Sequence, residues 1–261
     1  MKFYQIWTYL DGLGWLLLML GPLLFAQRWL HREIQIMFLL ITRKPSIALG
    51  LFSLLFFPGV LLHELSHYLV ARLLGVRTGR FSLLPSVMPD GKLRLGYVET
   101  AGSDLVRDAL IGTAPLFAGG AAVAYLGINR MGLVPLAVYI TQADWQGLLN
   151  SLNVLPVQQD FWLWFYLAFT ISSTMLPSAS DRRAWLPIFL VGVFLLGLAL
   201  LIGAGPWMLE NLAPWLNRAL RAMATIFGIS LALHLVLLLP LRLLRELVLR
   251  ASGLRLAPAV E

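Results

Sequence analysis

Long apolar segments place the tightest limit on how this 261-residue chain can fold. Hydrophobic residues make up 59% of the sequence and charged residues only 13%, which is about half the charged share of an average soluble domain. About 20 apolar residues in a row are enough for a helix to cross a bilayer. We therefore predict an all-α polytopic membrane protein with about six transmembrane helices. Their expected ranges are 5–27, 47–75, 109–129, 160–178, 185–204 and 219–241.

Three other segments do not fit this pattern. Residues 33–42 are apolar but too short to cross a bilayer, so we expect an interfacial helix or a partial insertion there. Residues 133–141 are also short and predict a re-entrant or interfacial segment. Residues 77–99 include a turn sequence at 88–91, after which polar and apolar residues alternate. This pattern is typical of a β-hairpin, which we expect to associate with the membrane.

No stretch between the apolar segments is long enough for a separate soluble domain. We divide the chain into an N-terminal helix with its interfacial segment (1–46), a core (47–184), and C-terminal helices with a short tail (185–261). The first helix is expected to be retained rather than cleaved as a signal peptide, because its apolar part is long. The tail after Arg250 is expected to be disordered.

The net charge of +7 does not predict nucleic-acid binding. Lys and Arg flank the apolar segments and form no run of their own, which is typical of membrane topology. Most of them fall on the side that the chain reaches after His67, so we expect that side to be cytoplasmic. The chain is therefore predicted to be an integral membrane protein in contact with the lipid bilayer.

The second apolar segment contains the pentad His63-Glu64-Leu65-Ser66-His67. Residues four apart share one face of a helix, so two imidazoles can reach one Zn²⁺ with Glu64 beside them. The alternative is a pair of unrelated membrane histidines. Several polar groups together in hydrocarbon are costly, however, and normally mark a functional site. The chain has no Cys, so any third protein ligand must be His, Asp or Glu.

Two aspartates compete for the position of third ligand. His63 and His67 lie about 24–30 Å from the start of their predicted helix. The helix predicted at 160–178 runs in the same direction, because the segment between them returns the chain. Asp181 follows its end and so reaches a similar depth, whereas Asp160 precedes its start, about 30 Å away. We predict Asp181 as the ligand; the alternative is a solvated carboxylate beside two arginines.

Two further histidines are not predicted to be ligands. His234 lies in the last apolar segment and is expected to be packed or hydrogen-bonded there. His31 lies between Arg28 and Arg32, which predicts a position at the membrane interface.

These features resemble the site-2 protease family of intramembrane zinc metalloproteases, the M50 peptidases. The pentad at 63–67 lies within a membrane segment, and the hairpin at 77–99 precedes a helix start at 108–116 that is similar to the family's Gly-Pro helix start. Asp181 matches the aspartate of the family signature N-x-x-P-x-P-x-L-D-G. The resemblance covers residues 47–181 approximately.

The match around Asp181 has three departures from the family signature. Ser173 replaces the Asn, Pro177 is displaced by one position, and Arg182 replaces the Gly. These departures leave open a non-proteolytic membrane scaffold of the same family type. A metal-ion transporter that uses His and Asp along its path is a further alternative.

The resemblance implies an intramembrane zinc endopeptidase that cuts transmembrane protein or peptide substrates near the cytoplasmic face of a prokaryotic cytoplasmic membrane. His63, His67 and Asp181 would hold Zn²⁺ and Glu64 would act as the general base. The sequence does not indicate the substrate or the oligomeric state.

A substrate helix must unwind before its carbonyls can be attacked, so an extended segment has to be held beside the metal. We expect the hairpin strand from Leu93 to Val98 to pair with that segment, with Leu93, Leu95 and Tyr97 as substrate-binding residues. The alternative is a hairpin that covers the site without binding substrate.

Overall fold

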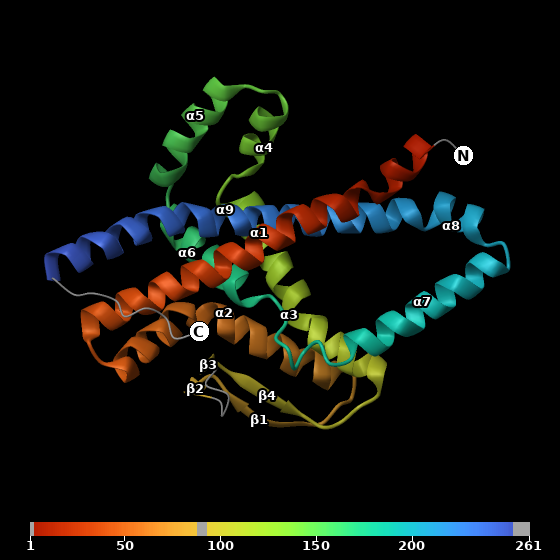
Figure 1. Cartoon of the computed structure of the whole chain (residues 1–261), viewed down its shortest axis with the longest axis horizontal. Helices are drawn as coiled ribbons and strands as arrows, with labels where there is room; N and C mark the ends of the chain where they lie inside the picture. Colours follow the sequence, from red (N-terminus) through yellow and green to blue (C-terminus); the bar gives the residue numbers. More distant parts are fainter. Residues whose placement is uncertain (1–2, 88–92, 253–261) are drawn as a thin grey trace.

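The computed structural model describes residues 3–87 and 93–252, and most of these residues are helical (Figure 1). The turn predicted at 88–91 and the tail beyond Ser252 lie outside the described residues. The helices are α1 (Phe3–Thr42), α2 (Pro45–Leu73), α3 (Leu105–Tyr125) with a π-helical turn (Leu126–Arg130), α4 (Val134–Thr141), α5 (Trp145–Val154) with a 3-10 turn (Leu155–Val157), α6 (Phe161–Thr174), α7 (Trp185–Leu201), α8 (Gly205–Asn211) and α9 (Ala213–Ser252). The strands are β1 (Thr78–Ser82), β2 (Ser86–Val87), β3 (Leu93–Arg94) and β4 (Tyr97–Thr100).

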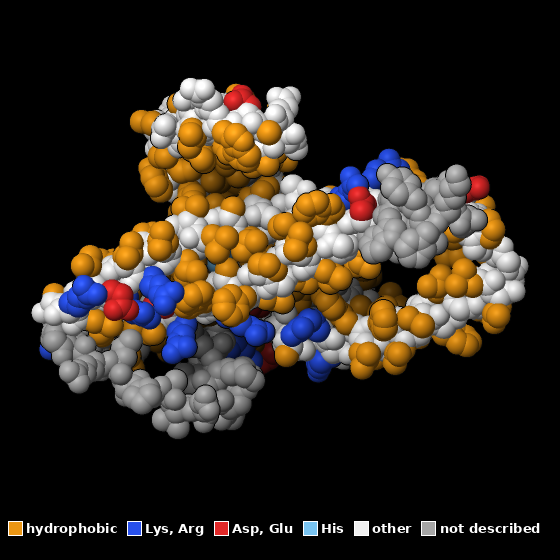
Figure 2. All heavy atoms as spheres, turned by 45° about the horizontal axis from the view of Figure 1, so that its top comes forward, with side chains coloured by type: hydrophobic (Ala, Val, Ile, Leu, Met, Phe, Trp, Pro, Cys, Tyr) orange, Lys and Arg blue, Asp and Glu red, His pale blue; other side chains and the backbone are white. Residues whose placement is uncertain are grey.

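Four of the described helices, α1, α2, α3 with its π-helical turn, and α9, are long and apolar enough to cross a membrane. The pair α7 and α8, bent by 115°, would supply a fifth span if it is one broken helix. Hydrophobic side chains cover much of the face shown in Figure 2. These features indicate a membrane-embedded, mainly helical protein, as predicted. Within residues 3–87 and 93–252, four or five segments are long and apolar enough to cross, compared with the expected number of about six.

Helix α1 is continuous over Phe3–Thr42, so the predicted division into a span at 5–27 and a separate segment at 33–42 is wrong. The sequence between these two ranges contains neither Pro nor Gly, the residues that most readily interrupt a helix. Glu33 is charged and so lowers the local hydropathy of the sequence. In the structure its side chain is buried, and its carboxylate accepts two hydrogen bonds of 2.8 Å from Arg245 on α9. The ion pair joins two helices that are far apart in sequence, and it lets a charged residue stand within one long apolar helix.

Helix α6 is shorter than the predicted span at 160–178. Its 14 residues extend about 21 Å, less than the hydrocarbon thickness of about 30 Å. Pro177 explains the early end, because proline cannot donate a backbone hydrogen bond and disfavours helical geometry in the residue before it. The chain then runs as a loop from 175 to 184, and this loop contains Asp181.

The first and last long helices, α1 and α9, pack along their lengths and run in the same direction (Figure 1). Near the start of both, Asp11 accepts hydrogen bonds from Asn217 at 2.7 Å and from Arg221 at 3.0 Å. Near the end, Glu33 pairs with Arg245. The two polar contacts are separated by about 33 Å of helix, close to the thickness of a bilayer core, so they bracket an apolar interface.

The segment predicted at 133–141 forms α4, which the following α5 accompanies as a helical hairpin that stands away from the other helices (Figure 1). The turn between them contains Ala143 in the left-handed region, with a φ of 54°. Asp144 begins α5 by accepting a hydrogen bond from the amide of Gly147 at 2.9 Å, a common N-cap contact.

The predicted hairpin is present as two short antiparallel pairs, β1 with β4 and β2 with β3. Its second strand is not continuous, because Leu95 and Gly96 separate β3 from β4. In the described residues β4 pairs only with β1. Its other edge therefore has backbone groups available for an additional strand.

Helices α2 and α6 run side by side in the same direction, as predicted from the chain reversal between them. Leu55 on α2 accepts a hydrogen bond from the hydroxyl of Tyr166 at 2.9 Å. One turn later Gly59 lies so close to α6 that a Cβ would be 2.2 Å from the carbonyl oxygen of Thr170. The glycine thus permits a close helix contact, and the next turn of α2 brings His63 to the end of α6.

Candidate metal centre

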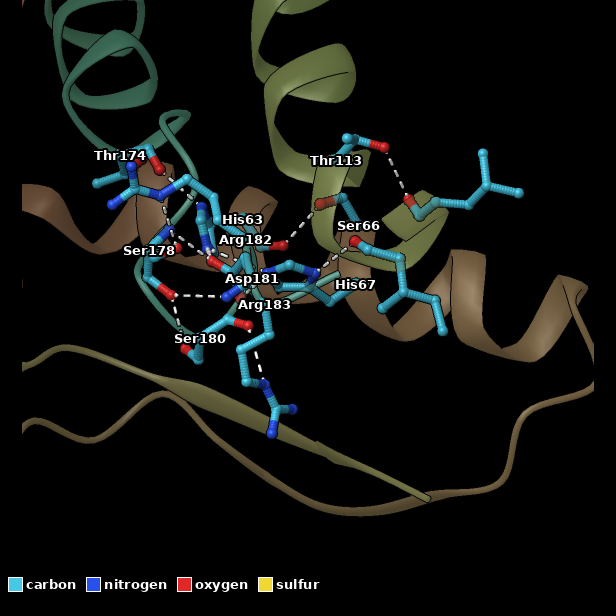
Figure 3. A network of polar contacts seen from close by, with 12 residues as sticks. His63, Ser66, His67, Thr113, Thr174, Ser178, Ser180, Asp181, Arg182 and Arg183 are labelled. Carbon is cyan, nitrogen blue, oxygen red and sulfur yellow. Dashed lines mark hydrogen bonds and ion pairs between the residues drawn. The ribbon is translucent and has the colours of Figure 1, made fainter. Parts of the chain in front are cut away.

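The pentad lies in the second half of α2, where His63 and His67 point in the same direction (Figure 3). Their Nε2 atoms are 3.2 Å apart. His67 is buried and His63 is partly buried. His63 is about 27 Å along the helix from Pro45, so the pair lies deep in the segment.

Each imidazole is held by a backbone carbonyl on its other nitrogen. Nδ1 of His63 donates to the carbonyl of Thr174 at 2.6 Å, and Nδ1 of His67 donates to that of Ile111 at 2.8 Å. A carbonyl can only accept, so the proton of a neutral ring is on Nδ1 and the lone pair is on Nε2. Both rings are thus oriented with Nε2 ready to bind a metal, in the arrangement common for metal-binding histidines.

Asp181 faces these two nitrogens from the loop after α6 (Figure 3). Its carboxylate oxygens lie 3.7 Å from Nε2 of His63 and 3.4 Å from Nε2 of His67. The amide of Ser178 donates to the same carboxylate at 2.7 Å. On the other side, a Cβ on Gly112 of α3 would lie 2.0 Å from the carbonyl oxygen of Asp181. The missing side chain therefore allows the loop to lie against α3.

The structure thus brings together the three residues predicted as zinc ligands. One ligand atom from each of His63, His67 and Asp181 lies within 4.8 Å of the other two. Two imidazole nitrogens and one carboxylate oxygen are a donor set that suits Zn²⁺ and leaves a position for water. The residues fit the predicted metal. Asp160 is outside this group, since it precedes α6 while Asp181 follows it.

The charge state of Asp181 suits a ligand. Burial alone would raise the pKa of its carboxyl, but the two nearby imidazoles, when protonated, and the donating amide of Ser178 outweigh this effect. The pKa is therefore held well below its ordinary value, and the carboxylate is ionised at neutral pH.

Glu64 is buried beside the two histidines and has only 7% of its surface exposed. Gly96 of the hairpin covers it, because a Cβ at this position would lie 2.9 Å from Cγ of Glu64 and 3.0 Å from Cγ1 of Val60. The carboxyl group is thus confined between α2 and the start of β4, next to the proposed metal position.

A cavity of about 730 Å³ adjoins these groups. Its walls come from α1, α2, the hairpin, α3 and the loop after α6. Every residue from Arg94 to Thr100 lines it, including Leu95 and Tyr97; that these two residues bind substrate stays a prediction. The backbone of Leu93 is in β3, but its side chain lies outside the described part of the structure.

His31 lies on α1 and contributes to the cavity wall. Its predicted position at the membrane interface stays a prediction. His234 is fully buried and hydrogen-bonded to Ser173 and Ser230, as expected for a residue that is not a ligand.

Apart from the helix start at 108–116, which contains Gly112, the sequence did not indicate the residues that position the ligands. The carbonyls of Ile111 and Thr174 belong to backbone groups that no side-chain motif marks. Gly96 and Gly112 matter through absent side chains. In the sequence these two positions are marked only by being glycines, and a glycine alone is not a specific signal.

Comparisons of the chain with protein-family models, with curated proteins and with solved structures found no significant match. The function is therefore inferred from the motif and from the geometry of the site.

Replacing Asp181 by Ala is expected to weaken zinc binding by more than about 100-fold. Loss of a residue that only supports a metal ligand costs about 10- to 100-fold, and loss of the ligand itself should cost more. Asp160→Ala is the matched control, because it removes a carboxylate at the opposite end of α6. The measurement is zinc competition with a chelator on purified protein, together with the metal content. Unchanged zinc affinity in Asp181→Ala would contradict the assigned ligand set.

Proposed function

We propose that this protein is an intramembrane zinc metalloendopeptidase that hydrolyses peptide bonds of transmembrane proteins or peptides near the cytoplasmic face of a prokaryotic cytoplasmic membrane. The observation that supports this most is the convergence of His63, His67 and Asp181 beside the buried carboxyl group of Glu64. The resemblance to the site-2 protease family supports the same conclusion.

The chemistry divides between the metal and Glu64. Zn²⁺, when bound, would supply Lewis acidity to a water molecule and to the substrate carbonyl. Glu64 accepts the proton of the attacking water and returns it to the departing amine, so the carboxyl group serves as base and then as acid. Its confinement between α2 and Gly96 holds it in one place for both proton transfers.

The hairpin provides the surface that an unwound substrate requires. Residues from Arg94 to Thr100 border the cavity, and in the described residues β4 has one edge without a partner strand. An extended peptide can add to such an edge through backbone hydrogen bonds. The substrate segment would then lie between β4 and the proposed zinc position, with its carbonyls accessible.

The other two functions make different demands on the structure. A transporter needs successive sites along a path, whereas in residues 3–87 and 93–252 one group of metal-binding side chains is found. A scaffold needs no chemistry at Glu64. A single substitution of this residue can therefore distinguish a scaffold from a protease.

Glu64→Gln is expected to bind zinc as the wild type does but to reduce cleavage by at least about 100-fold, because the substitution keeps the shape and removes the base. The purified protein would be reconstituted with a library of transmembrane peptides, and products would be identified by mass spectrometry. Glu210→Gln, on α8, is the control. Full cleavage by zinc-loaded Glu64→Gln would contradict the proposal, and a wild type that cleaves nothing would favour the scaffold.

Gly96→Ala tests the role of the hairpin. Its Cβ would collide with Glu64 and Val60, so β4 should move away from the metal centre by a fraction of an ångström to an ångström. The cleavage rate is expected to fall about 10- to 100-fold, because small displacements of reacting groups slow a reaction by this much. The zinc content should be unchanged. Gly102→Ala is the matched control, because no atom lies within 4 Å of a Cβ there. Equal cleavage rates for the two variants would show that the position of β4 is unimportant.

A further inference from the structure

The last turn of α6 is completed by side chains from other helices. The helix ends at Thr174, and the carbonyl groups at the end of a helix have no partner within it. The carbonyl of Ser173 accepts a hydrogen bond from the side-chain amide of Gln27, on α1, at 2.5 Å. The carbonyl of Thr174 accepts from Nδ1 of His63, on α2, at 2.6 Å (Figure 3). Two successive carbonyls of α6 therefore join it to α1 and to α2.

Ser173 also contacts α9 through its hydroxyl. Nδ1 of His234 donates to the carbonyl of Ser230 at 2.7 Å, so Nε2 of the neutral ring accepts from the hydroxyl of Ser173 at 3.0 Å. Ser173 and His234 are buried, with 3% and 0% of their surfaces exposed. A buried polar group that loses its partner costs free energy, so this contact fixes the position of Ser173. The residue is thus attached to α9 by its side chain and to α1 by its backbone.

The position of Ser173 determines where the next carbonyl lies. Thr174 follows directly, and its carbonyl is the group that keeps the proton of a neutral His63 ring on Nδ1. Hydrogen bonds of this kind have a range of roughly half an ångström, so a small displacement of the last turn is enough to release the ring. A released ring can carry its proton on Nε2, and this nitrogen is then unable to bind a metal.

We propose that Ser173, His234 and Gln27 are positioning residues of the metal centre, which hold the end of α6 where the carbonyl of Thr174 fixes the tautomer and the orientation of His63. They extend the support of the site to α1 and α9, which carry none of the predicted metal ligands. This inference rests on the metal site of the proposed function, but it requires neither a substrate nor cleavage.

Ser172 offers a matched comparison in the same turn of α6. It is also buried, with 0% of its surface exposed. Its hydroxyl, however, donates to the carbonyl of Phe169 within α6, at 2.9 Å. Replacing Ser172 by Ala therefore removes a buried hydroxyl without removing a contact between helices. The comparison separates a positioning role from a general effect on stability.

The test measures the tautomer of His63 in the zinc-free protein and the zinc affinity of the same preparations. Isotopic labelling of the ring nitrogens of the four histidines, read by NMR at a pH where imidazole is neutral, reports which nitrogen carries the proton, and His63→Gln assigns the signal. Ser173→Ala and His234→Phe are expected to give a mixture of His63 tautomers and zinc binding about tenfold weaker, the lower end of what loss of a supporting residue costs. Gln27→Met keeps the length of the side chain without its donor and should have the same effect.

Further variants identify the contact that is responsible. The double variant Ser173→Ala/His234→Phe should weaken zinc binding no more than either single change, because both changes remove the same hydrogen bond. His234→Gln supplies an amide oxygen that can accept from Ser173, so it should restore part of the affinity. Ser172→Ala should keep the tautomer and the zinc affinity of the wild type.

A wild-type tautomer and zinc affinity in both Ser173→Ala and His234→Phe would overturn the inference, even if these variants unfold at a lower temperature. An equal loss in Ser172→Ala would also overturn it. The proposed function fails in a different way. A wild type that binds zinc but cleaves no peptide overturns the protease activity and leaves the positioning role in place. In a protein that binds no zinc, the tautomer of His63 still decides whether these residues position the ring.

Discussion

The hydrogen bonds from the two imidazoles to backbone carbonyls are the interaction on which the rest of this site depends. They join α2 to the end of α6 through Thr174 and to α3 through Ile111. Each bond fixes the tautomer and the orientation of a ring, and each requires a neighbouring helix at a particular distance. The geometry of the metal centre is thus set by helix packing as much as by the motif.

Small residues explain how these helices come close enough. Gly59 lets α2 approach α6, and Gly112 lets the loop with Asp181 lie on α3. Gly119, also on α3, lets this helix approach the residue that follows α6, because a Cβ there would lie 2.4 Å from Cβ of Met175. In a membrane, where apolar burial gives little drive for helix association, close packing of this kind is a main source of stability. The glycines therefore support the site without touching a metal.

Much of the site could be predicted from the sequence because its chemistry is local. The pentad places two imidazoles on one helix face, and the chain reversal before α6 is sufficient to select Asp181 over Asp160. The β-hairpin also follows from local alternation. The structure brings His63, His67 and Asp181 together; whether they bind zinc remains a prediction.

The parts that could not be predicted depend on contacts between distant segments. Hydropathy alone divides α1 at Glu33, because the sequence does not show that Arg245, far along the chain, pairs with this carboxylate. The packing of His31 against Phe56 of α2, and with it the place of His31 in the cavity wall, is likewise a contact between separate helices. The early end of α6 was missed for another reason. The helix ends at Thr174, but apolar residues continue to Pro177, so hydropathy does not mark the start of the loop.

X-ray absorption spectroscopy at the zinc edge of the purified, zinc-loaded protein tests the central claim most directly. The geometry described here predicts one zinc per chain with two imidazole ligands at about 2.0–2.1 Å and oxygen ligands at about 2.0–2.2 Å. Zinc bound without imidazole scattering, or a protein that binds no zinc, would contradict it.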